Sequence, residues 1–135
     1  MNILLNPGDH VIVLYPNYQS LYEIINAVPG CSYSRWNLHD GGDRLWLADQ
    51  YDKAISIGGL SKSYGLAGLR VGWIAGKDAG VLKKIEKFKH YTSICDSAPS
   101  EFLAIIALRH SVVLMERNIE IIRKNMNYAH FFPKA

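Results

Sequence analysis

One lysine and one arginine stand eight positions apart in the glycine-rich stretch Gly58–Gly72, as Lys62 and Arg70. A lysine in a desolvated pocket loses its proton near neutral pH, and its amine then attacks a carbonyl carbon to form a Schiff base. An arginine offers a planar fork of donors that suits a phosphate group. The glycines permit tight turns and a close approach of the backbone to a ligand. The pattern therefore combines a candidate nucleophile with a candidate phosphate clamp.

By charge alone, Lys62 would be an ordinary surface lysine, since lysines are almost always exposed. Its setting favours a functional role, because it follows the apolar run Ala54–Ile57 and has no acidic neighbour. The carboxyl end of a buried strand is where open α/β sheets bind their ligands. A nucleophilic lysine with a phosphate clamp is what pyridoxal phosphate requires of its protein.

Other kinds of site do not fit the sequence. The stretch Gly58–Gly72 contains no GxGxxG, GxxxxGK[ST] or GxSxG pattern, and the five histidines form neither HxxH nor HExxH. The two cysteines, Cys31 and Cys95, belong to no CxxC pair. A net charge of +3 over 135 residues is too small to indicate a nucleic-acid platform. We therefore expect neither a metal site nor a nucleic-acid partner.

Apolar runs and helical periodicity outline the elements that must position Lys62 and Arg70. Short apolar runs predict strands over 11–15, 31–36, 54–57 and 71–75, the first of them a parallel strand buried on both faces. Helical spacing predicts helices over 18–28, 81–88 and 101–126, with Pro99 suited to a first-turn position. The lysines around the second helix predict a solvated face: Lys83, Lys84, Lys87 and Lys89. The order of elements predicts an α/β layer followed by a helical segment that leads out of it.

The fourteen residues Gly59–Gly72 resemble, position by position, the lysine signature of the class I/II pyridoxal-phosphate aminotransferases, the fold-type I enzymes. The segment Pro7–Val13 with Tyr18 is similar to the family's strand and to the aromatic residue that stacks on the cofactor. The resemblance implies that Lys62 forms the Schiff base and moves the proton, that Arg70 binds the phosphate, and that Tyr18 stacks on the pyridine ring. Ser61 is a further candidate for cofactor binding. The family often has a phosphate-binding hydroxyl three positions before the lysine, where this chain has Gly59.

The resemblance also implies a fold: an α/β, aspartate aminotransferase-like large domain that is partial here and covers 1–76. The helical segment 77–135 leads toward an incomplete small domain. Between Leu38 and Lys53 the sequence lacks the family's Asn-Pro-x-Gly motif, and the resemblance does not place there the aspartate that pairs with the pyridinium nitrogen or its nearby tyrosine. We therefore expect a truncated or internally deleted form, with a deletion near 44–49. The family's glycine-rich phosphate turn and its substrate arginine are expected before Met1 and after Ala135.

The function that the resemblance implies is transfer of an amino group between an amino acid and a 2-oxo acid, with lyase or decarboxylase chemistry as alternatives on the same scaffold. A second hypothesis is a catalytically inactive remnant that binds pyridoxal phosphate weakly or associates with a full-length relative. Because enzymes of the family are dimers, we expect a homodimer or such an association. The sequence has neither a basic leader nor an apolar run of ~20 residues, so we expect a cytoplasmic protein without a membrane partner.

Overall fold

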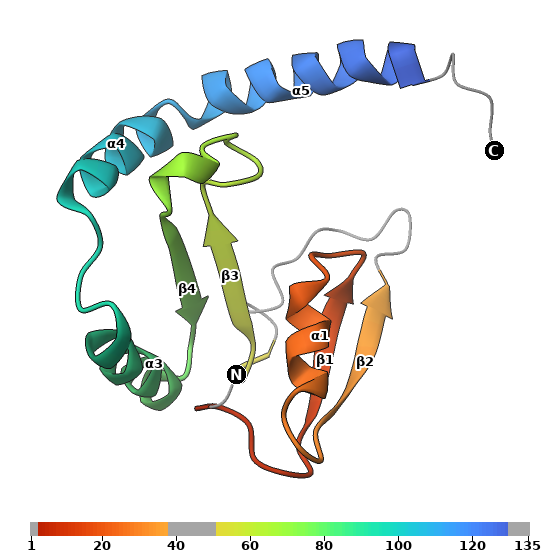
Figure 1. Cartoon of the computed structure of the whole chain (residues 1–135), viewed down its shortest axis with the longest axis vertical. Helices are drawn as coiled ribbons and strands as arrows, with labels where there is room; N and C mark the ends of the chain where they lie inside the picture. The colour runs from red at the N-terminus through yellow and green to blue at the C-terminus, as the bar shows by residue number, and fades with distance from the viewer. Residues whose placement is uncertain (1–2, 38–50, 130–135) are drawn as a thin grey trace. The chain divides into compact units, whose positions relative to one another are not determined.

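The computed structural model describes residues 3–37 and 51–129 (Figure 1). They form two compact units that alternate along the chain. The first unit comprises Met1–Ala54 and Gly76–Thr92, and the second comprises Ile55–Ala75 and Ser93–Ala135. Both units contain strands and helices, which confirms the α/β class. The expected domain boundary at residue 76 stays a prediction, and the expected deletion near 44–49 lies outside the described residues.

The first unit opens with a β–α–β element, β1 (His10–Tyr15), α1 (Ser20–Asn26) and β2 (Ser32–Asn37). The strands are parallel, with His10 opposite Ser32 and Tyr15 opposite Asn37, as the sequence predicts. The prediction that β1 is buried on both faces is wrong. Only Val13 of β1 is buried, and Ile12 on the other face is 62% exposed. One face is covered by α1 through the fully buried Ile25, and successive strand residues point to opposite faces.

An aromatic cluster joins α1 to the two strands. The ring of Tyr22 lies 6.3 Å from that of Tyr15 and 5.8 Å from that of Tyr33, between centroids. The guanidinium of Arg35 lies 4.6 Å from the centroid of the Tyr15 ring, in cation–π contact. A hydrogen bond with the Tyr33 side chain raises the pKa of Arg35. The cluster fixes α1 on the sheet with amphipathic side chains in place of a purely aliphatic core.

The second unit contains a hairpin-like pair, β3 (Ile55–Gly59) and β4 (Gly72–Gly76), which Figure 1 shows running in opposite directions. The strand–loop–strand order predicted for this stretch is confirmed. A Cβ atom at Gly58 would overlap the indole of Trp73, so only glycine lets the two strands approach there. The chain turns between the strands through the short 3₁₀ helix η1 (Ala67–Leu69).

Three longer helices follow, α3 (Ala79–Thr92) in the first unit, and α4 (Ala98–Arg109) and α5 (Ser111–Ala129) in the second. The single helix expected over 101–126 is wrong, because the chain bends by 82° between α4 and α5. His110 ends α4: its backbone N–H donates to the carbonyl of Ile106 at 3.1 Å, and its ring Nδ1 contacts the same oxygen at 2.9 Å. Pro99 occupies the first turn of α4, as predicted.

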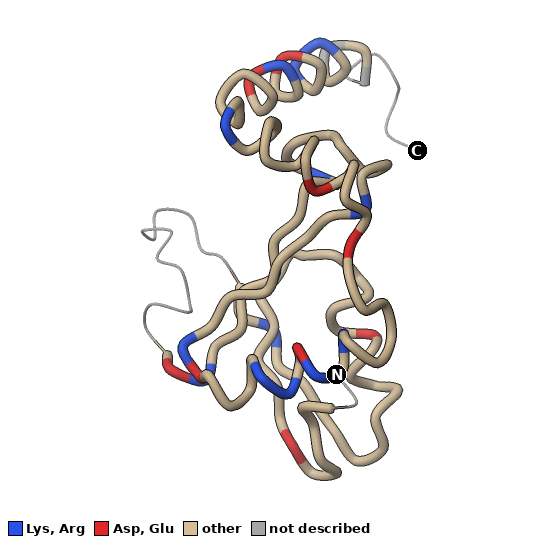
Figure 2. The backbone as a smooth tube through the Cα atoms, turned by 90° about the vertical axis from the view of Figure 1, so that its left-hand side faces the viewer, with Lys and Arg blue, Asp and Glu red and all other residues tan. Residues whose placement is uncertain are grey.

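The surfaces of these helices differ in character. On α3, Lys83, Lys84 and Lys87 are exposed, which confirms the solvated face, while Lys89 is half-buried. In Figure 2, acidic and basic residues alternate along α5, and Lys124 pairs with Glu120 at 2.8 Å. Among the described residues, no single helix is long and apolar enough to cross a membrane; α4 and 111–126 meet that test only as a bent pair.

Candidate functional site

The connection from β3 to β4 carries three of the four predicted site residues. Ser61 and Lys62 follow the end of β3, where Ser61 is half-buried and Lys62 is exposed. The expected buried strand with a desolvated lysine pocket is therefore wrong for this structure, because no residue of β3 is buried and Ile57 is 61% exposed. Arg70 lies exposed just before β4. Tyr18, the fourth, belongs to the first unit, where it lies between β1 and α1 and is 63% exposed. The second unit therefore presents a hydroxyl, an amine and a guanidinium on one loop.

A buried leucine anchors this loop at its base. Leu60 is fully buried, its N–H donates to the carbonyl of Val71 at 3.1 Å, and its carbonyl accepts from the N–H of Leu66 at 2.9 Å. The carbonyl of Lys62 accepts from the N–H of Gly65 at 3.0 Å, which closes a tight turn directly after the lysine. The sequence folds this way because Gly65 takes a φ of +67°, a left-handed conformation that glycine adopts without strain.

Arg70 has an unusual backbone for its residue type. It follows η1 with φ 56° and ψ 34°, in the left-handed region that costs a residue with a side chain roughly 1–2 kcal/mol. Its guanidinium Nη1 donates to the carbonyl of Ala67 at 3.2 Å, and its N–H donates to the same oxygen at 3.4 Å. Strain of this kind persists where the surrounding structure holds it, and it gathers at ligand sites.

The donors on this loop fit the chemistry of pyridoxal phosphate. The amine of Lys62 suits the cofactor's carbonyl carbon, and the guanidinium of Arg70 and the hydroxyl of Ser61 suit its phosphate. At Gly59, a Cβ atom would lie 3.4 Å from the carbonyl oxygen of Val71, which is an ordinary contact. A Cβ atom is tolerated at that position, where this chain has glycine and therefore no hydroxyl. The phosphate contacts available on the loop are therefore those of Arg70 and Ser61.

Sequence reasoning missed two features of this loop. One is the left-handed conformation of Arg70, for which no local sequence pattern gives a signal. The other is a pair of side chains from α5, Arg117 and Asn118, which hydrogen bond to the loop across 53 and 55 positions of sequence. Hydrophobic periodicity predicts a helix in this part of the sequence, but it does not predict which loop the helix contacts.

Neighbouring groups add little to this site. Within 3–37 and 51–129, no group of three or more His, Cys, Asp or Glu side chains is placed to hold a metal ion. Asp49, the acid that stands where the sequence leads into β3, lies outside the described residues. Tyr51 is exposed, and Asp52 pairs with Lys77 at 3.4 Å.

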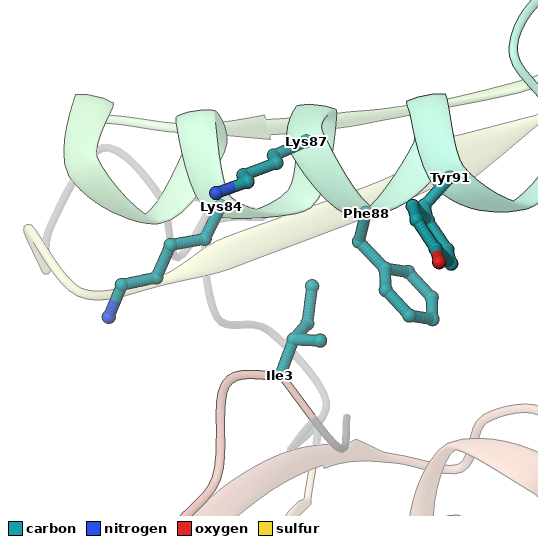
Figure 3. Close-up of a pocket in the computed structure, with 5 residues that line it drawn as sticks. All are labelled: Ile3, Lys84, Lys87, Phe88 and Tyr91. Atoms are coloured by element: carbon teal, nitrogen blue, oxygen red, sulfur yellow. The ribbon is translucent and has the colours of Figure 1, made fainter.

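A shallow groove of about 380 Å³ lies elsewhere, in the first unit. Figure 3 shows Ile3 pointing toward Phe88 and Tyr91 of α3, with the side chains of Lys84 and Lys87 extending from the same helix. None of the four predicted site residues lines the groove. The groove combines three apolar or aromatic side chains with two lysines, and it shares no residue with the loop that carries Lys62.

Comparison with known proteins bears on the family and the fold. The family model "Aminotransferase class I and II" matches residues 30–129. Histidinol-phosphate aminotransferase of Staphylococcus aureus (strain MRSA252) is 26% identical over 125 residues, which cover 81% of this chain and 35% of that protein. Capreomycidine synthase of Streptomyces vinaceus is 30% identical over 89 residues, which cover 65% of this chain and 22% of that protein.

A solved structure extends the comparison to three dimensions. A PLP-dependent aminotransferase from Streptococcus suis 89-1591 superposes with a TM-score of 0.71 at 24% identity. The match covers 96% of this chain and 51% of that chain. The chain therefore has a fold found within that protein. It spans about half the length of the solved chain and about a third of the curated histidinol-phosphate aminotransferase.

Proposed function

Because this chain belongs to the class I and II aminotransferase family, with residues 30–129 matching the family, we propose that it serves pyridoxal-phosphate-dependent transfer of an amino group between an amino acid and a 2-oxo acid. The observation that carries the proposal is the loop from β3 to β4, which presents an amine, a hydroxyl and a guanidinium together. The left-handed backbone of Arg70 supports it, since a strained arginine on a glycine-rich loop indicates a binding role.

Each residue has a role that its own chemistry supports. Lys62 would hold the cofactor's aldehyde group through Nζ, and its amine, when not bonded to the cofactor, is suited to accept and return the substrate's proton. Arg70 binds the phosphate through two parallel N–H groups, and Ser61 adds a hydroxyl. Tyr18, whose exposed ring belongs to the first unit, stays a prediction from the resemblance as the residue that stacks on the pyridine ring. The chemistry supplied by bound pyridoxal phosphate is that of an electron sink for the substrate carbanion.

A second candidate function is association, either of two copies or with a full-length relative, without turnover. Exposed apolar side chains on α4 and α5 favour it: Phe102 and Val113 are each 65% exposed. Contiguous apolar surface of this kind indicates a partner or a tendency to aggregate.

The proposal is tested by titrating the 135-residue chain with pyridoxal phosphate and recording its absorption spectrum. We expect a new absorption band that Lys62→Ala abolishes and that Lys83→Ala, an exposed lysine on α3, leaves unchanged. A panel of amino acids, followed by a 2-oxo acid, then tests transfer of the amino group in each direction. Binding without transfer supports a catalytically inactive chain that holds the cofactor, and association is tested separately by light scattering. An unchanged band in Lys62→Ala contradicts the assignment of the lysine.

A further inference from the structure

Two carbonyl groups beside Lys62 are held by side chains from α5. The Nδ2 atom of Asn118 donates to the carbonyl of Ser63 at 2.8 Å. The Nη2 atom of Arg117 donates to the carbonyl of Tyr64 through a longer contact of 3.4 Å. Both partners belong to the second unit, and Asn118 is half-buried while Arg117 is exposed. Side chains of α5 therefore contact the backbone of the loop that carries Lys62.

The orientation of the Asn118 amide is set from both sides. Its Oδ1 atom accepts from Arg117, with Nε at 3.3 Å and Nη2 at 3.1 Å. Its Nδ2 atom faces a carbonyl oxygen, which can only accept. A guanidinium only donates, so a flipped amide would lose both interactions. Asn118 is thus a bridge between Arg117 and the loop.

The turn beside the lysine is shaped for this bridge. A Cβ atom at Gly65 would lie 3.0 Å from Nδ2 of Asn118, 3.1 Å from its Oδ1 and 3.3 Å from Nη2 of Arg117. A side chain there would require the ends of Asn118 and Arg117 to move by a few tenths of an ångström, and the φ of +67° independently favours glycine. With Gly65 donating to the carbonyl of Lys62, three successive carbonyls, those of residues 62, 63 and 64, each accept a hydrogen bond.

We propose that Asn118, oriented by Arg117, is a positioning residue for Lys62. By holding the carbonyl of Ser63, it fixes the turn from which the lysine side chain leaves the backbone. The inference rests on the proposed function, in which Lys62 bonds to the cofactor. Small displacements of a reacting group slow a reaction that depends on alignment. We therefore expect the loss of the Asn118 hydrogen bond to change the reactivity of the Lys62 amine as well as the order of the loop.

The test uses the full chain without cofactor and compares four variants. Asn118→Asp keeps the shape and replaces the donor by an acceptor, whereas Asn118→Leu removes both. Asn118→Gln restores a donor on a longer side chain. Asn125→Asp is the matched control, an exposed asparagine on the same helix. Circular dichroism establishes that each variant keeps its helices.

Hydrogen exchange at the amide of Gly65 reports the turn, and acylation of Lys62 relative to Lys83 reports the amine. We expect Asn118→Asp and Asn118→Leu to raise the exchange rate and to change the acylation ratio by roughly 2- to 12-fold, the range of one hydrogen bond. Asn118→Gln should restore part of both, and Asn125→Asp should alter neither. Unchanged exchange and acylation in both Asn118→Asp and Asn118→Leu would overturn the proposal.

A second readout separates this inference from the function on which it rests. In the chain loaded with pyridoxal phosphate, we expect the absorption band to shift or weaken in Asn118→Asp and to recover in Asn118→Gln. If Lys62→Ala keeps the band, the proposed function fails, whatever happens at Asn118. If Lys62→Ala abolishes the band while both donor-deleting variants leave it and the exchange rate unchanged, positioning by Asn118 fails and the function stands.

Discussion

Replacing Arg70 separates the cost of its backbone conformation from the value of its guanidinium. Arg70→Ala and Arg70→Gly both remove the guanidinium and its contact to the carbonyl of Ala67. They differ in the left-handed backbone, φ 56°, which strains alanine by roughly 1–2 kcal/mol and leaves glycine unstrained. The greater freedom of glycine in the unfolded chain offsets about 0.5–1 kcal/mol of that difference. We therefore expect Arg70→Gly to be at least as stable as Arg70→Ala, by up to about 1.5 kcal/mol in urea unfolding.

Cofactor affinity should respond to the two changes alike. Hydrogen bonds to charged groups contribute about 1.5–3 kcal/mol, so both variants should bind pyridoxal phosphate roughly 10- to 150-fold more weakly. Arg70→Lys keeps a charge and loses the bidentate fork, and should still lose about 1–3 kcal/mol of binding free energy. An alanine variant more stable than the glycine variant by about 0.5–1 kcal/mol, the difference expected from chain entropy alone, would refute the strain at Arg70. Unchanged affinity in all three variants would refute its role as the phosphate ligand.

Three other expectations follow from the same loop and from the exposed helices. Borohydride reduction of the chain with pyridoxal phosphate, followed by peptide mapping, should place the label on Lys62; label spread over the exposed lysines of α3 would indicate nonspecific modification. Light scattering at micromolar concentration should show self-association that Phe102→Asp reduces, because that ring is 65% exposed on α4; a monodisperse wild-type monomer would contradict this. The chain alone should turn over amino donors no faster than free pyridoxal phosphate, because the resemblance places neither an aspartate for the ring nitrogen nor a substrate arginine in this sequence; multiple turnovers abolished by Lys62→Ala would show the reverse.

Local patterns were sufficient to predict the first unit and insufficient for the last helices. Strand 11–15, a helix and strand 31–36 were predictable as a parallel β–α–β element, because alternation and helical spacing act over a few residues. The break between α4 and α5 was not predictable from such patterns, because apolar residues continue on both sides of His110. What ends α4 is a histidine that satisfies the carbonyl of Ile106 by its own backbone and ring, and capping by histidine has no strong sequence signature.

The candidate site divides in a similar way. Lys62 and Arg70 were identifiable because their side chains and their spacing among glycines carry the chemistry directly. The conformation of Arg70 and the bridge from Asn118 depend on contacts that form only in the fold, one of them across 55 positions. Periodicity identifies the elements, whereas the hydrogen-bond partners of a loop depend on which helix end or face meets it.

Holding a cofactor and turning it over place different demands on this chain. The groups that suit holding lie on one loop of the second unit: the amine of Lys62, the hydroxyl of Ser61 and the guanidinium of Arg70. That loop draws its order from within the same unit, through the buried Leu60 and through α5. Turnover also needs a protonated ring nitrogen and an aligned substrate, and the resemblance assigns no residue of this sequence to those tasks. We therefore expect the chain to capture pyridoxal phosphate at Lys62 more readily than it transfers an amino group.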